Sequence, residues 1–270
     1  VPISYPPMLR DMLGPTWDLF DGGNSGENTA EIGARQGAFK PRIKLTSGSV
    51  SSIYLDSPLV PDNAFRCTRW KLGLDQPPRG LNPATVNGVE CMVAYNSITP
   101  VVPGAPLTLK DGDEIVTYAA SHYRDVDVLV IYMGAGGGFS SIDNLIEQIE
   151  AMVDFTLKKQ FIVMTHHNSK GFHLQGTDTE YISKMNEAFG EHVLHLREEG
   201  NKRAEEFLLK TGVISDVSEI SETDRKYIDN GDWPLSFMRS ESDAHFTREG
   251  SMVVATLVME KMVKLGYLTK

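Results

Sequence analysis

The sequence has few basic residues, few cysteines and no long apolar run. Its 270 residues include 26 Lys and Arg against 36 Asp and Glu, so the formal net charge is −10. No basic stripe is present to meet phosphates, and we therefore expect no nucleic-acid partner. No apolar run approaches the roughly 18 residues that a membrane span needs, so we expect no such span.

Cysteine occurs only as Cys67 and Cys91, outside any Cys-x-x-Cys motif. One disulfide would fit this count, but two small buried side chains are the simpler expectation, and the redox compartment stays open. The residues from Val1 to Pro7 contain neither a basic stretch nor an apolar core, so they predict no signal peptide. The absence of an initial methionine is consistent with a processed, trimmed or partial chain.

Patterns of strand and helix alternate near the N-terminus and again after Asp125. The nearly unbroken apolar run from Val126 to Met133 predicts a parallel strand buried on both faces. We predict further strands over 17–20, 161–165 and 192–196, and helices over 5–14, 29–38, 142–152, 180–189 and 247–265. After the strand over 192–196 we predict a helix-rich stretch to 209 and then irregular chain from 210 to 243. This alternation predicts an α/β fold with helices on both faces of a parallel sheet.

Between Pro41 and about His122, apolar and polar residues alternate between frequent turn residues. Such a pattern predicts short antiparallel strands. We interpret residues 41–122 as a β-rich insertion subdomain, and residues 1–40 and 123–270 as one α/β domain. The insertion should pack beside the parallel sheet and contribute none of its strands.

Three motifs carry candidate chemistry, and each lies at a predicted strand end or helix start. The glycine-rich stretch 22–29 has backbone N–H groups that could bind an anion, although a tight turn also explains its glycines. The stretch 134–138 offers either oxyanion donors or a flexible turn. Asp243 and His245 precede the last helix, as a general-base pair or as surface-loop residues. Since the carboxyl ends of parallel strands share one edge, we expect Gly26, Gly136 and His245 around one cleft.

Together these motifs resemble the SGNH/GDSL hydrolase superfamily, particularly its members with a β insertion found in bacterial and phage-associated proteins. Residues 26–37 resemble the family's second sequence block, 128–138 the third and 242–250 the fifth. The approach to the fifth block, from Asn230 onward, is also similar. The resemblance covers nearly the whole chain, with the exception of the first block.

The resemblance implies a flavodoxin-like three-layer α/β/α sandwich that hydrolyses esters, often acetyl groups on carbohydrates, without a cofactor or metal. The implied substrate is an ester or acetylated glycan. In this scheme the backbone N–H of Gly26 stabilises the oxyanion and His245 is the catalytic base. The oligomeric state stays open, as does the compartment, for which secreted, cell-surface and phage-associated locations all fit.

The chain departs from the family pattern at the nucleophile, the oxyanion donor and the carboxylate. It contains no Gly-Asp-Ser, Gly136 stands where the family has asparagine, and Ser242 stands where it has aspartate, with Asp243 one place further on. One hypothesis is an esterase whose Gly-Asp-Ser strand is encoded upstream of Val1 and whose Asp243 orients His245. The other is a non-catalytic carbohydrate-binding or structural module. Loss of an N-terminal segment would not explain why positions 136 and 242 lack the family's asparagine and aspartate. These two departures therefore favour weak or no activity.

Two further candidates receive less support from the sequence. Ser25 could replace the nucleophile, but it does not lie in a Gly-x-Ser-x-Gly elbow. His166, His167 and His173 could bind a metal, but adjacent histidines at a strand end point to opposite sides. We therefore expect these histidines to be solvent-facing loop residues.

Overall fold

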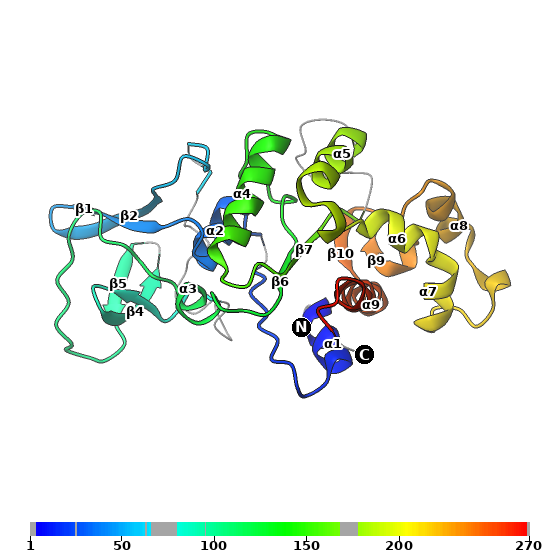
Figure 1. Ribbon diagram of the computed structural model, residues 1–270, viewed down its shortest axis with the longest axis horizontal. Helices are drawn as coiled ribbons and strands as arrows, with labels where there is room; N and C mark the ends of the chain where they lie inside the picture. Colours follow the sequence, from blue (N-terminus) through cyan, green and yellow to red (C-terminus); the bar gives the residue numbers. More distant parts are fainter. Residues whose placement is uncertain are drawn as a thin grey trace.

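The chain folds as a mixture of helices, one parallel sheet and several antiparallel sheets (Figure 1). The computed structural model describes residues 4–24, 26–62, 64–65, 80–94, 96–167 and 178–268. The parallel sheet has the order β6-β7-β8, formed by Leu129–Ile131, Phe161–Met164 and Val193–Leu194. The predicted α/β character is confirmed, with strands shorter than the apolar runs that predict them.

The parallel sheet is covered by apolar side chains on both faces. Along β7, Ile162 and Met164 join one apolar cluster whereas Val163 joins another, because neighbouring residues of a strand point to opposite faces. Helices α1 (Tyr5–Leu13) and α9 (Arg248–Lys264) contribute to the first cluster. Helices α4 (Ile142–Phe155) and α5 (Asp178–Phe189) contribute to the second. These four helices begin or end within a few residues of the predicted boundaries.

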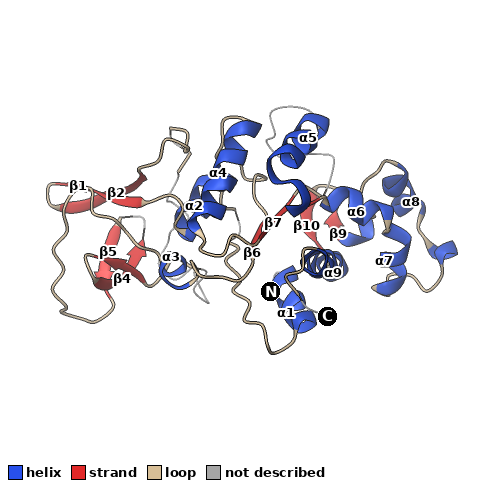
Figure 2. Cartoon of the chain, viewed as in Figure 1, coloured by secondary structure: helices blue, strands red, loops and turns tan. Residues whose placement is uncertain are grey.

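The remaining helices and the last hairpin complete this part of the chain (Figure 2). The helices are α2 (Thr29–Gln36), α6 (Leu196–Lys202), α7 (Ala204–Lys210) and α8 (Glu222–Asp229), and the hairpin pairs β9 (Met238–Ser240) with β10 (Asp243–Phe246). The prediction of irregular chain from 210 to 243 is therefore wrong for α8 and β9. Helix α8 is largely polar, with only Asp224 fully buried, so it has no apolar stripe to mark it.

The predicted strand over residues 17–20 is also wrong, because these residues form irregular chain. A strand needs a partner, and no strand among the described residues pairs with the outer edge of β6. Trp17 and Leu19 instead pack their side chains against the first apolar cluster. Their apolar character thus reflects burial without sheet pairing.

The middle of the chain forms antiparallel sheets, as predicted from its alternating pattern. Strands β1 (Pro41–Thr46) and β2 (Ser49–Leu55) make one hairpin, and β3 (Ala84–Val86), β4 (Val89–Ala94) and β5 (Ser97–Pro100) make a three-stranded sheet. Single bridges from Glu114 and Val116 connect the segment before helix α3 (Tyr118–His122) to both sheets. None of these strands joins the parallel sheet. The domain boundaries at 41 and 122 stay a prediction.

Two further expectations concern the cysteines and the membrane. Cys91 is buried with a free thiol, whose pKa is raised by burial and, to a smaller extent, by Glu90. Cys67 lies outside the described residues. No helix in the described part of the chain combines the length and the apolar character needed to cross a membrane.

Candidate functional site

Helix α2 begins at the glycine-rich turn because Asn28 caps it. The Asn28 side chain accepts a hydrogen bond from the Glu31 N–H at 3.0 Å, while the Glu31 carboxylate accepts one from the Asn28 N–H at 2.9 Å. This reciprocal pair is a capping box, which satisfies two N–H groups that a helix start leaves unpaired. Gly26, two residues earlier, has a φ of +79°, a backbone conformation that favours glycine.

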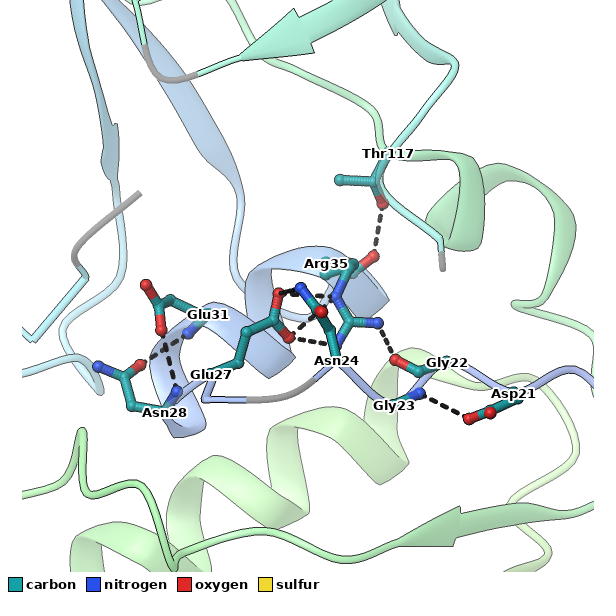
Figure 3. Close-up of polar contacts among 9 residues, drawn as sticks. All are labelled: Asp21, Gly22, Gly23, Asn24, Glu27, Asn28, Glu31, Arg35 and Thr117. Carbon is teal, nitrogen blue, oxygen red and sulfur yellow. Dashed lines mark hydrogen bonds and ion pairs between the residues drawn. The ribbon is translucent and has the colours of Figure 1, made fainter. Parts of the chain in front are cut away.

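A buried ion pair between Glu27 and Arg35 holds this turn against the rest of α2 (Figure 3). The Arg35 Nε lies 3.1 and 3.0 Å from the two Glu27 carboxylate oxygens, and Nη2 also binds this carboxylate. The Arg35 Nη1 donates to the Gly22 carbonyl, and the Arg35 carbonyl accepts from the Thr117 hydroxyl at 2.7 Å. One guanidinium thus ties both ends of the turn to α2. The sequence reasoning missed this pair.

The second glycine-rich segment, which follows β6, lies directly against the first. The Gly137 carbonyl accepts a hydrogen bond from the Thr29 N–H at 2.9 Å. A Cβ atom placed on Gly136 would lie 2.5 Å from the Glu27 carbonyl oxygen, so only glycine fits this close approach. Gly26 and Gly136 are both exposed, and their N–H groups donate to no acceptor within the described residues. Two predicted oxyanion elements therefore lie side by side.

Asp243 and His245 form a hydrogen-bonded pair on β10. Side chains two residues apart on a strand point to the same side, so Asp243 reaches the His245 Nδ1 although the family pattern places the carboxylate one residue earlier. The His245 N–H and then its imidazole lower the pKa of Asp243. An ionised carboxylate only accepts hydrogen bonds, so Nδ1 is the donor in this pair, and in a neutral imidazole Nε2 then has the lone pair. The His245 side chain is 66% exposed.

His166 and His167 are buried, so the prediction of solvent-facing histidines is wrong. They are 7% and 4% exposed and follow β7 at the same edge as the glycines that follow β6. The His167 Nδ1 lies 2.7 Å from the Tyr132 hydroxyl, and its ring packs against Phe246, next to His245. The His166 ring faces Tyr181 on α5. The two rings thus have different neighbours: His167 contacts the residue after β6 and the last hairpin, whereas His166 contacts α5.

The four predicted site residues form two groups, one on the two glycine-rich segments and one on β10. Gly26 and Gly136 make one group, and Asp243 and His245 make the other. Tyr132 lies in the chain between β6 and Gly136 and contacts His167, whose ring packs against Phe246, the residue after His245. No hydrogen bond among the described residues joins His245 directly to Gly26 or Gly136.

Two other candidates from the sequence have different outcomes. Ser25 and His173 lie outside the described residues. Within the described part of the chain, no cluster of three or more His, Cys, Asp or Glu side chains could hold a metal ion. A cavity of about 260 Å³ lies elsewhere, between α1, α7 and α9, and is lined mainly by apolar side chains. None of the four predicted site residues lines that cavity.

In comparisons with known proteins, the chain matches no family model, no curated protein and no solved structure.

We predict that Gly136→Ala separates the two glycine-rich segments. The new methyl group would meet the backbone of Glu27 at 2.5 Å, and backbone cannot rotate away as a side chain can. Overpacking of this kind costs about 1–3 kcal/mol, measured as the free energy of unfolding in urea. Gly23→Ala is the control, because its methyl group would meet only the flexible Asp21 carboxylate at 3.2 Å. Equal losses in both variants would contradict the close approach.

We also predict that His166 makes stability depend on pH. Burial lowers the pKa of His166 from 6.5 to about 4, although Asp178 opposes this shift. Between these values the unfolded chain binds a proton that the folded chain does not, so stability is complete above about pH 6.5 and falls towards pH 4. At about 1.4 kcal/mol per pKa unit, the loss is on the order of 3 kcal/mol.

The test compares urea unfolding of the wild type, His166→Gln and His122→Gln from pH 7 to pH 4. We expect the free energy of unfolding to depend less steeply on pH in His166→Gln than in the other two proteins. His122→Gln is the control because His122 is exposed. Equal slopes in all three proteins would show that His166 titrates normally.

Proposed function

We propose that the protein is an ester hydrolase of the SGNH/GDSL type, acting on carboxylesters or on O-acetyl groups of carbohydrates. The proposal includes a flavodoxin-like three-layer α/β/α arrangement around the parallel sheet. The observation that carries it is the bond between Asp243 and His245 just before α9. In a neutral imidazole this bond leaves the lone pair on Nε2 of an exposed side chain, as a general base requires.

The proposed roles follow from the chemistry of acyl transfer. His245 Nε2 takes the proton from an attacking hydroxyl, and the Asp243 carboxylate stabilises the imidazolium that forms. Negative charge then develops on the ester carbonyl oxygen. The N–H groups of Gly26 and Gly136 lie on adjacent segments and are available to donate to it. With glycine at position 136, the site lacks a side-chain amide donor, whose loss typically lowers kcat by about 10²- to 10³-fold.

The nucleophile is the part of this proposal that the 270 residues lack, because they contain no Gly-Asp-Ser. In the family scheme, this serine follows the first strand, shortly before a segment that residues 5–9 resemble. The outer edge of β6 pairs with no strand among the described residues. A longer polypeptide that includes such a segment is therefore the informative comparison.

A non-catalytic module is the second candidate. Gly136 and Ser242 replace two side chains of the family scheme, and Ser242 is an exposed residue that contacts Ser240. A descendant that retained the fold while losing catalysis would bind carbohydrate at the same edge. The two candidates differ in whether His245 contributes to turnover.

We predict that the chain hydrolyses p-nitrophenyl acetate no faster than its His245→Ala variant. A histidine base acts on a positioned hydroxyl, so without that nucleophile its contribution is largely lost. The assay compares both proteins at equal concentration with a third sample, extended by the native codons upstream of Val1. The esterase proposal expects turnover in the extended protein that disappears on His245→Ala.

The other outcomes of this assay are also decisive. His245-dependent turnover in the 270-residue chain would show that another hydroxyl acts as nucleophile, with Ser25 the first to replace. No His245-dependent turnover in the extended protein would overturn the esterase proposal and leave the binding module.

A further inference from the structure

A segment of the β-rich unit is fastened to both glycine-rich segments of the candidate site. It comprises Asp56–Asp62 and Ala64–Phe65, which follow β2, and we call it the wall segment. It consists of two successive turns, closed by hydrogen bonds from Val60 N–H to Ser57 carbonyl and from Ala64 N–H to Pro61 carbonyl. These turns do not determine where the wall segment lies. Its position is determined by hydrogen bonds from α4 and from the start of α2.

The first attachment comes from two amide side chains of α4. The Leu59 carbonyl accepts hydrogen bonds from the Asn144 side chain at 2.9 Å and from the Gln148 side chain at 3.0 Å. The same Gln148 nitrogen also donates to the Gly138 carbonyl at 3.0 Å. Gln148 is fully buried, so one amide bridges the wall segment and the turn that contains Gly136.

The second attachment comes from the N-terminus of α2. The Ala64 carbonyl accepts a hydrogen bond from the Asn28 side-chain nitrogen at 2.5 Å. Asn28 is 8% exposed and lies two residues after Gly26. Buried polar groups cost free energy unless they are paired, so these attachments are built into the fold. The wall segment is therefore held next to both proposed oxyanion elements.

The charge of the wall segment indicates which ligands it accepts. Residues 56–65 contain two aspartates and no lysine or arginine. Asp56 is paired with Arg42, whereas Asp62 is exposed and forms no ion pair within the described residues. A carboxylate of this kind accepts hydrogen bonds from hydroxyl groups and repels anions.

We infer that the wall segment selects the alcohol part of the ester, with Asp62 favouring neutral, hydroxyl-rich alcohols over anionic ones. This inference rests on the proposed function for the identity of the site. It gives the β-rich unit a role in substrate specificity. The side chains of Asn28, Asn144 and Gln148 hold the wall segment beside the glycine-rich segments.

The test uses two probes that differ only in charge, methyl O-acetyl-β-glucoside and methyl O-acetyl-β-glucuronide. Their binding is measured by saturation-transfer NMR titration of the 270-residue chain and of Asp62→Lys. We expect the wild type to bind the neutral probe about 3- to 10-fold more tightly than the anionic probe, and Asp62→Lys to reverse this order. The exposed position of Asp62 makes misfolding of the variant a minor concern, and its thermal midpoint serves as a check.

A second pair of variants tests the attachment. Asn28→Ser keeps a capping hydroxyl for α2 but removes the nitrogen that holds Ala64. We expect faster amide hydrogen exchange in the wall segment and at least a 3-fold loss of affinity for the neutral probe, since 0.7 kcal/mol corresponds to about 3-fold. Gln36→Ser is the control, because it removes an amide that holds the Met152 carbonyl at the other end of α2.

Equal affinity for the two probes in both the wild type and Asp62→Lys would overturn the inference. If the extended protein then still showed His245-dependent turnover, the esterase proposal would stand, but the wall segment would have no role in selecting the alcohol. A charge preference that follows Asp62 in a protein without turnover would support the wall segment and reject the esterase.

Discussion

The arrangement of the candidate site depends on the buried ion pair between Glu27 and Arg35. The Glu27 side chain is completely buried, and the Arg35 guanidinium binds its carboxylate through several N–H groups, as a buried carboxylate requires. The same guanidinium binds the Gly22 carbonyl, and the Thr117 hydroxyl fixes the backbone at Arg35. The Asn24 side chain also donates to the Glu27 carboxylate at 3.1 Å, so the contacts of this one carboxylate hold the turn that carries Gly26 to α2.

The β-rich unit and the α/β part meet through two kinds of contact. Ala34 and Phe39, at the end of α2, belong to the apolar cluster of the β-rich unit. The second kind of contact is polar. The side chains of Asn28, at the start of α2, and of Asn144 and Gln148, on α4, donate hydrogen bonds to the wall segment. Apolar contact stabilises without fixing direction, whereas hydrogen bonds require particular distances and angles. The polar contacts therefore determine where the wall segment lies relative to the glycine-rich turns.

The sequence predicts the elements that an apolar run or an apolar helix face marks. Strand β6 follows from a nearly unbroken apolar run, and helix α4 follows from apolar residues that recur on one face. The Glu27–Arg35 pair could not be predicted in this way, because residues eight apart do not face each other unless a turn brings one of them back. The closeness of Gly136 to Glu27 likewise depends on packing between distant segments.

Other features were hidden because their context is not local. His166 and His167 are polar residues after a short strand, and their burial depends on Tyr132, Tyr181 and Phe246. If residues 242–245 formed a loop, an aspartate at position 243 in place of 242 would indicate that the catalytic carboxylate is lost. Recognising β10 as a strand changes this interpretation, since a spacing of two then places Asp243 and His245 on one side. The flavodoxin-like arrangement and the esterase activity remain proposals.

The most direct test of this account is a double-mutant cycle on the buried pair. Glu27→Gln, Arg35→Met and the double variant are unfolded in urea, and amide hydrogen exchange is followed for residues 22–28. Leaving one charge buried without its partner costs about 3–5 kcal/mol, so we predict large losses in both single variants, a double loss clearly below their sum, and faster exchange in the turn. Losses below about 1 kcal/mol that simply add, with unchanged exchange, would contradict the claim that this ion pair organises the site.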